Sequence, residues 1–151
     1  MPGFQFRLQQ YLGIKEQIED QKELAYAKAL QMLQAEKVRL QSFIDQRLNT
    51  INAMRDALMQ IIDPVEIRRM NNVIERLNYN IIVQKERVRA AEEFTEAKRQ
   101  ELVEAMKERK ALEIVKDSAL EEHLHENGLT ERKQIDELIS FKHTVKGVHL
   151  D

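Results

Sequence analysis

The sequence predicts an all-α protein, a long antiparallel two-helix coiled-coil hairpin with a short C-terminal helical segment. Gly occurs 4 times and Pro 2 times in 151 residues, which is too few for a loop-rich β fold. Charged residues make up 33% of the chain and aromatic residues 5%, a composition typical of long exposed helices. Apolar residues also recur at alternating spacings of three and four on both sides of Pro64, as they do in a coiled-coil seam.

The first helix is expected at residues 4–62. Its predicted seam comprises Tyr26, Leu30, Leu33, Lys37, Leu40, Ile44, Arg47, Ile51, Met54, Leu58 and Ile61. Farther upstream the same step is kept by Phe4, Leu8, Tyr11, Lys15 and Ile18. Between Ile18 and Leu30 the seam positions are instead spaced by four residues. Consecutive steps of four predict a stutter, which locally unwinds a coiled coil.

The stretch "QIIDPVEIRRM" predicts the reversal between the two helices. Asp63 is a favoured N-cap and Pro64 a favoured first helical residue. Glu66 falls where it can close a capping box. Ile62 and Ile67 occupy the two positions of a hydrophobic staple. A residue that precedes proline avoids the α region, so the first helix should stop by about Ile62.

The second helix is expected at residues 64–126. Its predicted seam comprises Ile67, Met70, Ile74, Leu77, Ile81, Gln84, Val88, Ala91, Thr95, Lys98, Leu102, Ala105, Arg109, Leu112, Lys116, Ala119 and His123. Most of the polar members lie at Thr95 or later. The predicted seam is therefore almost entirely apolar near Pro64 and becomes more polar with distance from it. The two helices match in length, which favours a hairpin over a bent rod that pairs between molecules.

The stretch "HENGLTERK" predicts a break after the second helix. Gly128 is a natural residue to end a helix, and Thr130 can cap the start of another. A short third helix is therefore expected at residues 130–145, and the whole chain, residues 1–151, is interpreted as a single coiled-coil domain.

No residue pattern predicts catalysis or a cofactor. The chain has no cysteine, and no glycine-rich loop precedes a Lys-Ser or Lys-Thr pair. The best metal candidate is "EEHLHENG", but His123 and His125 point to different faces of a helix and a polar helix end explains the stretch better. A net charge of -2 argues against nucleic-acid binding, and the apolar runs are too short to cross a membrane. We therefore expect that the protein is not an enzyme, that it binds no metal or cofactor, and that it does not insert into a membrane.

Four cations, Arg47, Lys98, Arg109 and Lys116, lie on seam positions. Their stems can follow the seam while their heads reach water. Alternatively, the seam is weak where the two chain ends meet because these ends engage another protein. Met54, Met59 and Met70 cluster near the predicted turn, where packing explains them better than a binding surface does.

Two stretches resemble the flagellar FliJ family. "FQFRLQQYLGIKEQIEDQKELAYAKALQMLQAEKVRL" is similar to the N-terminal pattern of the family, in which an aromatic-Arg-Leu-Gln start leads into a helix. "KERKALEIVKDSALEEHLHENGLTERKQIDELI" is similar to its C-terminal signature, in which "ERKALE" is followed by "KQIDEL". The resemblance extends from Phe4 to about Phe141.

The resemblance implies a stalk-like coiled coil in the flagellar type III export apparatus. The expected partners are the hexameric export ATPase FliI with its regulator FliH, the cytoplasmic region of the export gate FlhA, and export chaperones. The resemblance further implies a protein that is monomeric when free and lies at the inner face of the membrane at the flagellar base. Two alternatives stay open: a generic scaffold that dimerises, and a stalk homologue of a non-flagellar type III system or a vacuolar-type ATPase.

The resemblance also implies two partner-binding surfaces. By position, the gate-binding surface would comprise Arg39, Phe43, Gln46, Val73, Leu77, Asn80 and Gln84. Leu77 and Gln84 also lie on the predicted seam, so a core role is the alternative for both. The ATPase-binding surface would comprise Phe4, Arg7, Leu8, Arg109 and Lys116.

Overall fold

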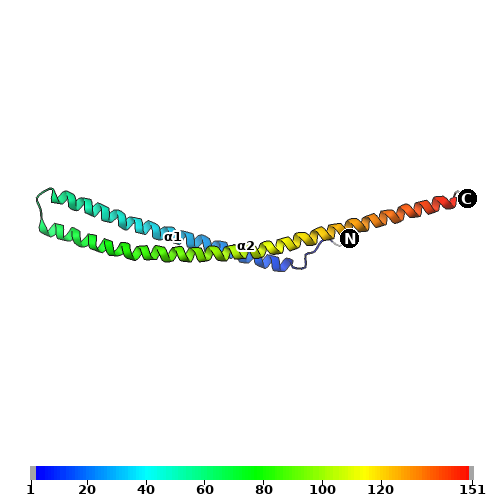
Figure 1. Cartoon of the computed structure of the whole chain (residues 1–151), viewed down its shortest axis with the longest axis horizontal. Coiled ribbons are helices and arrows are strands. Elements are labelled where there is room, and N and C mark those ends of the chain that lie inside the picture. The colour runs from blue at the N-terminus through cyan, green and yellow to red at the C-terminus, as the bar shows by residue number, and fades with distance from the viewer. Residues whose placement is uncertain (1–2, 150–151) are drawn as a thin grey trace. The chain divides into compact units, whose positions relative to one another are not determined.

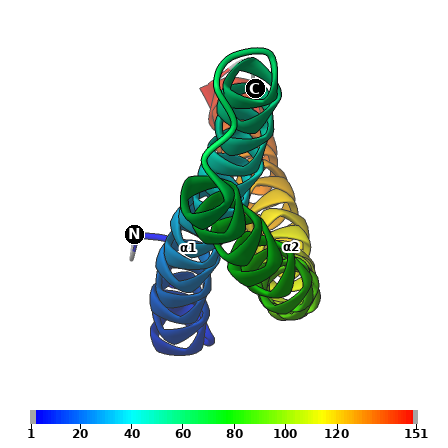
Figure 2. The ribbon, with the colours of Figure 1, turned by 90° about the vertical axis from the view of Figure 1, so that its left-hand side faces the viewer.

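Two long helices joined by a short connection form an antiparallel coiled-coil hairpin (Figure 1). The computed structural model describes residues 3–149, with side chains as far as residue 144. Helix α1 spans Gln9–Leu58 and helix α2 spans Pro64–His149, and no strand occurs within the described residues. The predicted fold class is therefore confirmed. Seen from the turn, the connection runs directly from the end of α1 to the start of α2 (Figure 2).

The hairpin divides into two compact units. The turn unit spans Glu19–Ala105, and the terminal unit combines the described residues 3–18 with residues 106–149. Within the turn unit, contacts between the helices run in opposite chain directions, from Lys22 with Glu101 to Arg47 with Asn78. The interpretation of residues 1–151 as one domain stays a prediction.

The seam of α2 follows the predicted register. From Ile67 to His123, every one of the predicted seam positions is buried or half-buried. Leu77, Ile81 and Ala105 are among the most deeply buried of them. An unbroken step of three and four keeps this row of side chains facing the opposite helix, because in a supercoiled pair each turn of the α-helix takes up about 3.5 residues.

The seam of α1 differs from the prediction. Its buried and half-buried positions include an unbroken heptad row: Leu12, Lys15, Glu19, Lys22, Tyr26, Ala29, Leu33, Glu36, Leu40, Phe43, Arg47, Thr50, Met54 and Ala57. The predicted stutter is therefore wrong. Six predicted seam residues are exposed: Leu8, Tyr11, Leu30, Lys37, Leu58 and Ile61. The predicted seam follows large apolar residues, whereas the structure places the small Ala29 and the polar Glu36 in the seam.

Asp63 caps the start of α2. Its Oδ1 atom accepts a hydrogen bond of 3.1 Å from the N–H of Val65, and its carbonyl oxygen accepts one of 3.1 Å from the N–H of Ile67. This is the geometry of an N-cap, which satisfies an amide that has no partner inside the helix. The capping box is not formed, because Glu66 accepts a hydrogen bond from Arg69 instead. Ile62 is 57% exposed, and the hydrophobic staple stays a prediction.

Both ends of α1 lie inside the predicted range of residues 4–62. The helix begins at Gln9, because the chain before it folds so that the ring of Phe4 meets His123 in the terminal unit. It ends at Leu58 in a tightened turn, in which Met59 and Gln60 donate hydrogen bonds to carbonyl groups three residues earlier.

The predicted break at Gly128 is wrong, because α2 continues through it to His149. The backbone of Gly128 has no positive φ angle, and a Cβ atom added there would meet nothing within 4 Å. The hydroxyl group of Thr130 donates to the carbonyl group of Glu126, one turn earlier, rather than capping a new helix. One glycine inside a helix costs only about 1 kcal/mol relative to alanine, which does not end a long helix. The separate helix at residues 130–145 is thus the last part of α2.

We expect Asp63→Ala to lower the free energy of unfolding by about 1 kcal/mol, because the N–H of Val65 loses its acceptor. Asp63→Asn keeps an acceptor and should change stability little. The measurement is chemical denaturation followed by circular dichroism. Asp56→Ala, which removes a nearby exposed carboxylate, is the matched control; equal effects of Asp56→Ala and Asp63→Ala would refute the cap.

We expect Gly128→Ala to stabilise the C-terminal part of α2 by about 0.4–1 kcal/mol, because the backbone there is helical and has room for a Cβ atom. Slower amide hydrogen exchange in residues 124–140 would show this. If Gly128 instead ended the helix in a left-handed conformation, the same change would destabilise the segment and speed up exchange.

Candidate partner-binding surfaces

The terminal unit holds an open cleft beside the start of α1. It has a volume of about 390 Å³ and is lined by Phe4, Gln5, Phe6, Gln9 and Lys116. The N–H of Gln9 donates to the carbonyl group of Phe6 at 3.0 Å, which fixes the bend where α1 begins. The rings of Phe4 and His123 lie 5.5 Å apart and are tilted by 53°, a favourable aromatic arrangement. The cleft thus combines two aromatic rings, two amides and one cation.

The structure brings together two of the five residues predicted to bind the ATPase. Phe4 and Lys116 line the same cleft. Arg7 and Leu8 are exposed and lie in the chain between two cleft residues, Phe6 and Gln9. Arg109 lies two helical turns before Lys116, and its Nη1 atom contacts the carboxylate of Glu113 at 2.7 Å. The contact of these residues with an ATPase stays a prediction.

An ion pair joins the two helices within the terminal unit. Lys15 Nζ lies 2.8 Å from Glu108 Oε2, and also 5.2 Å from the centre of the Tyr11 ring. The hydrogen bond to Glu108 raises the pKa of Lys15, while partial desolvation acts in the opposite direction. Lys15 therefore stays positively charged near neutral pH, and its charge is partly neutralised by the carboxylate.

The seven residues predicted to bind the export gate divide into two groups. Leu77 is 6% exposed and Gln84 is 1% exposed, so both side chains face the seam. The other five are Arg39, Phe43, Gln46, Val73 and Asn80, and each is exposed or half-buried. Only this second group can meet a partner while the hairpin is closed.

Two adjoining grooves lie near the predicted gate-binding residues of the turn unit. One, of about 310 Å³, is lined by Asn49, Thr50, Ala53, Glu66, Arg69, Met70 and Val73. The other, of about 360 Å³, is lined by Val38, Gln41, Ser42, Asp45, Gln46 and Asn49. Asn49 borders both grooves and is not among the residues predicted to bind a partner. A polar residue on the outer face of a regular helix carries no sequence signal that separates binding from solvation.

The connection between the helices and the start of α2 expose large apolar side chains. Met59 is 82% exposed, Ile61 98% and Val65 74%. Packing around the turn therefore explains Met54 and Met70, which are half-buried, but not Met59.

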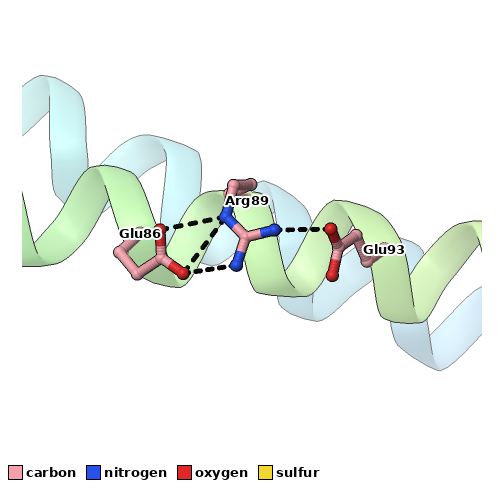
Figure 3. Close-up of polar contacts among 3 residues, drawn as sticks. All are labelled: Glu86, Arg89 and Glu93. Carbon is pink, nitrogen blue, oxygen red and sulfur yellow. Dashed lines mark hydrogen bonds and ion pairs between the residues drawn. The ribbon is translucent and has the colours of Figure 1, made fainter.

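Charged pairs lie on the outer face of α2. Arg89 contacts both Glu86 and Glu93 (Figure 3), and Arg99 contacts Glu96 at 2.7 Å. Hydrogen bonds from Arg89 and Arg99 lower the pKa values of Glu86 and Glu96. All these groups are exposed, so water and salt screen the pairs and they stabilise the helix only slightly.

Three of the four seam cations, Arg47, Lys98 and Arg109, contact polar or acidic side chains, and the partner of Arg109 is Glu113. Arg47 donates to the side-chain oxygen of Asn78 at 3.0 Å, and Lys98 donates to Glu101 at 3.4 Å. Glu101 also accepts from Lys22 of α1 at 3.4 Å, so it bridges the two helices of the turn unit. The hydrogen bond from Lys98, with the charge of Lys22, lowers the pKa of Glu101.

His123 of the candidate metal stretch contacts an aromatic ring and an amide. Its Nε2 atom lies 3.2 Å from Asn127 Nδ2, and the ring packs against Phe4. Among the described residues, no group of three or more metal-binding side chains comes together. Neither helix, over the same residues, is apolar enough along its length to cross a bilayer.

Comparison with known proteins gives two findings. Residues 4–147 match the family described as "Flagellar FliJ protein". A protein of Chlamydia trachomatis described as a YscO homolog has the same fold, with a TM-score of 0.57 and 22% identity over 95% of this chain and 97% of that one. No curated protein sequence matches the chain.

The family match and the helical hairpin together identify a helical component of a type III export apparatus. More particularly, the chain belongs to the flagellar FliJ protein family, since the match covers almost its whole length. This family is a non-catalytic part of the apparatus.

We expect acidification to destabilise the turn unit in part through Glu101. Because its pKa is lowered by folding, the contribution of Glu101 to stability is complete above the ordinary value of 4.5 and is lost as the pH falls through the lower folded value. Melting temperatures measured between pH 7 and pH 3 should fall less steeply for Glu101→Gln than for the wild type. Glu104 is an exposed residue nearby, and Glu104→Gln should show the same dependence of melting temperature on pH as the wild type. The same dependence in all three proteins would refute the role of Glu101.

Proposed function

We propose that this protein is a stalk-like element of the flagellar type III export apparatus, which promotes the assembly and activity of the hexameric export ATPase FliI. Family membership and the two-helix fold support this proposal. A pair of packed helices is about 20 Å wide, because each helix with its side chains measures about 10–12 Å. An element of this width suits the central opening of a ring.

The cleft of the terminal unit is the proposed contact with the ATPase. It offers the partly covered ring of Phe4 and the cation of Lys116, with Arg7 and Leu8 exposed nearby. Aromatic and cationic side chains at the rim of a concave surface favour a partner that presents apolar and acidic groups. Support for the proposal is strongest here, because residues of the N-terminal segment and of α2 meet in one cleft.

We further propose that the turn unit links the ATPase to the cytoplasmic region of the export gate FlhA and to export chaperones. The proposed gate-binding residues are Arg39, Phe43, Gln46, Val73 and Asn80, with Asn49 between the two grooves. The regulator FliH would meet this protein through the ATPase. The proposed location is the inner face of the membrane at the flagellar base, and the free protein is proposed to be a monomer.

The rate of ATP hydrolysis by the cognate FliI, with and without this protein, tests the proposal. The wild-type protein should raise the rate and run as a monomer in light scattering. Phe4→Ala and Lys116→Glu should each raise the concentration needed for half-maximal stimulation about tenfold, the effect of losing 1.4 kcal/mol of binding.

Lys85→Glu is the matched control, because Lys85 is exposed on the turn unit and lies far along α2 from the cleft. It reverses the same charge and should leave the stimulation unchanged. A stable dimer that does not affect hydrolysis would overturn the proposal and favour a generic coiled-coil scaffold.

A further inference from the structure

A polar pair interrupts the seam of the turn unit. Gln84 of α2 is 1% exposed, and among the described residues it is the largest side chain that is fully buried. Its Nε2 atom donates one hydrogen bond of 3.0 Å to the backbone carbonyl group of Glu36 and another to the carboxylate of the same residue. Both residues occupy seam positions, Gln84 in α2 and Glu36 in α1. The amide of Gln84 therefore finds its partners on the opposite helix.

A second polar contact across the seam lies one heptad from Glu36 along α1. Thr95 is 6% exposed, and its hydroxyl group lies 3.2 Å from the carbonyl oxygen of Ala29 and 2.7 Å from that of Ala91. The small side chain of Ala29, itself 2% exposed, lets Thr95 approach the backbone of α1. Among the described residues, no buried side-chain nitrogen or oxygen lacks a hydrogen-bond partner.

The apolar seam alone discriminates poorly between registers. Both heptad rows are unbroken, so sliding one helix past the other by seven residues again places seam positions opposite seam positions. The turn adds little resistance, because Leu58 and Val65 at the helix ends are already 46% and 74% exposed. The last turn of α1 and the first turn of α2 could therefore unwind and lengthen the connection, and little apolar burial would be lost.

The polar pair, by contrast, fits one register. A slip of one heptad would place Gln84 opposite Ala29 or Phe43, and would place Glu36 opposite Leu77 or Ala91. In either case the buried amide of Gln84 would lose its carboxylate acceptor, and the half-buried carboxylate of Glu36 would lose its amide donor. The hydrogen bond to the backbone carbonyl group is less specific, because every residue of α1 carries such a group. A buried polar group without a partner is disfavoured strongly, whereas the same group with a partner is nearly neutral.

We propose that the Gln84–Glu36 pair, supported by the contact between Thr95 and Ala29, sets the register in which α1 and α2 associate. The pair acts by excluding the alternatives: slipped hairpins, and association of seams between chains that would leave Gln84 without Glu36. Single buried polar residues fix register and partner choice in coiled coils in the same way, at some cost in stability. This inference does not depend on the proposed function.

The test compares wild type with the double variant Gln84→Leu/Glu36→Leu. The chain has no cysteine, so spin labels can be attached at cysteines introduced at the exposed positions Gln34 and Asn72. The labels are offset along the hairpin, so a slip of one heptad changes their separation by about 10 Å. Pulsed electron paramagnetic resonance should give one narrow distance for the wild type. The double variant should give a second distance, or a dimer in light scattering, although its melting temperature is equal or higher.

Three further variants make the result decisive. Gln84→Leu and Glu36→Leu should each lower the melting temperature, because each leaves one polar group without its partner, and the double variant should recover it. Thr50→Val is the matched control, because the hydroxyl group of this seam residue donates to Gln46 of its own helix, so a single distance should remain. A monomeric double variant with the single wild-type distance would overturn the proposal, as would strictly additive effects of the two single changes.

Discussion

The structure depends on the burial of two unbroken heptad rows against each other. Neither helix can bury its own row, so α1 and α2 are stable only as a pair. Among the described residues the buried apolar side chains are few, namely Leu12, Ala29, Leu77, Ile81 and Ala105. Most other seam residues are half-buried, which means that apolar burial is spread along both helices rather than gathered in a core. The cap at Asp63 fixes the residue at which α2 begins, and the seam fixes the side of α2 that packs against α1.

A seam of this kind tolerates polar residues because its edge is close to water. Lys98 and Arg47 direct their heads to partners at the edge, which is the arrangement expected for long side chains with apolar stems. Gln84 and Thr95 cannot do this, since both are buried, and they are accommodated because acceptors on α1 lie opposite them. The outer pairs, such as Glu86 with Arg89, have no comparable structural role because they are exposed and lie within one helix.

The sequence was sufficient for the fold class, the turn and the whole seam of α2, because large apolar residues mark that row. It was insufficient for α1, where Ala29 and Glu36 fill seam positions next to larger apolar neighbours that are exposed. Which neighbour faces inward depends on the opposite helix, here on the hydroxyl group of Thr95, and a single helix does not carry that information. Gly128 was misjudged for a related reason: a glycine permits a helix end but does not impose one. The cleft at Phe4 depends on a bend in non-helical chain, which periodicity does not describe.

The seam also limits where partners can bind. Seam side chains that are fully buried are unavailable at the surface, so Leu77 and Gln84 could contact the export gate only if the two helices separated there, whereas half-buried seam residues such as Phe43 stay partly accessible. Separation would expose the amide of Gln84 and the apolar row beside it, including Ile81, which is 2% exposed. Flanking positions carry no such cost: Arg39, Gln46 and Asn80 can change with a partner while the register stays fixed. In a two-helix protein, the residues that recognise partners and the residues that hold the fold must therefore alternate along the same helices, often one turn apart.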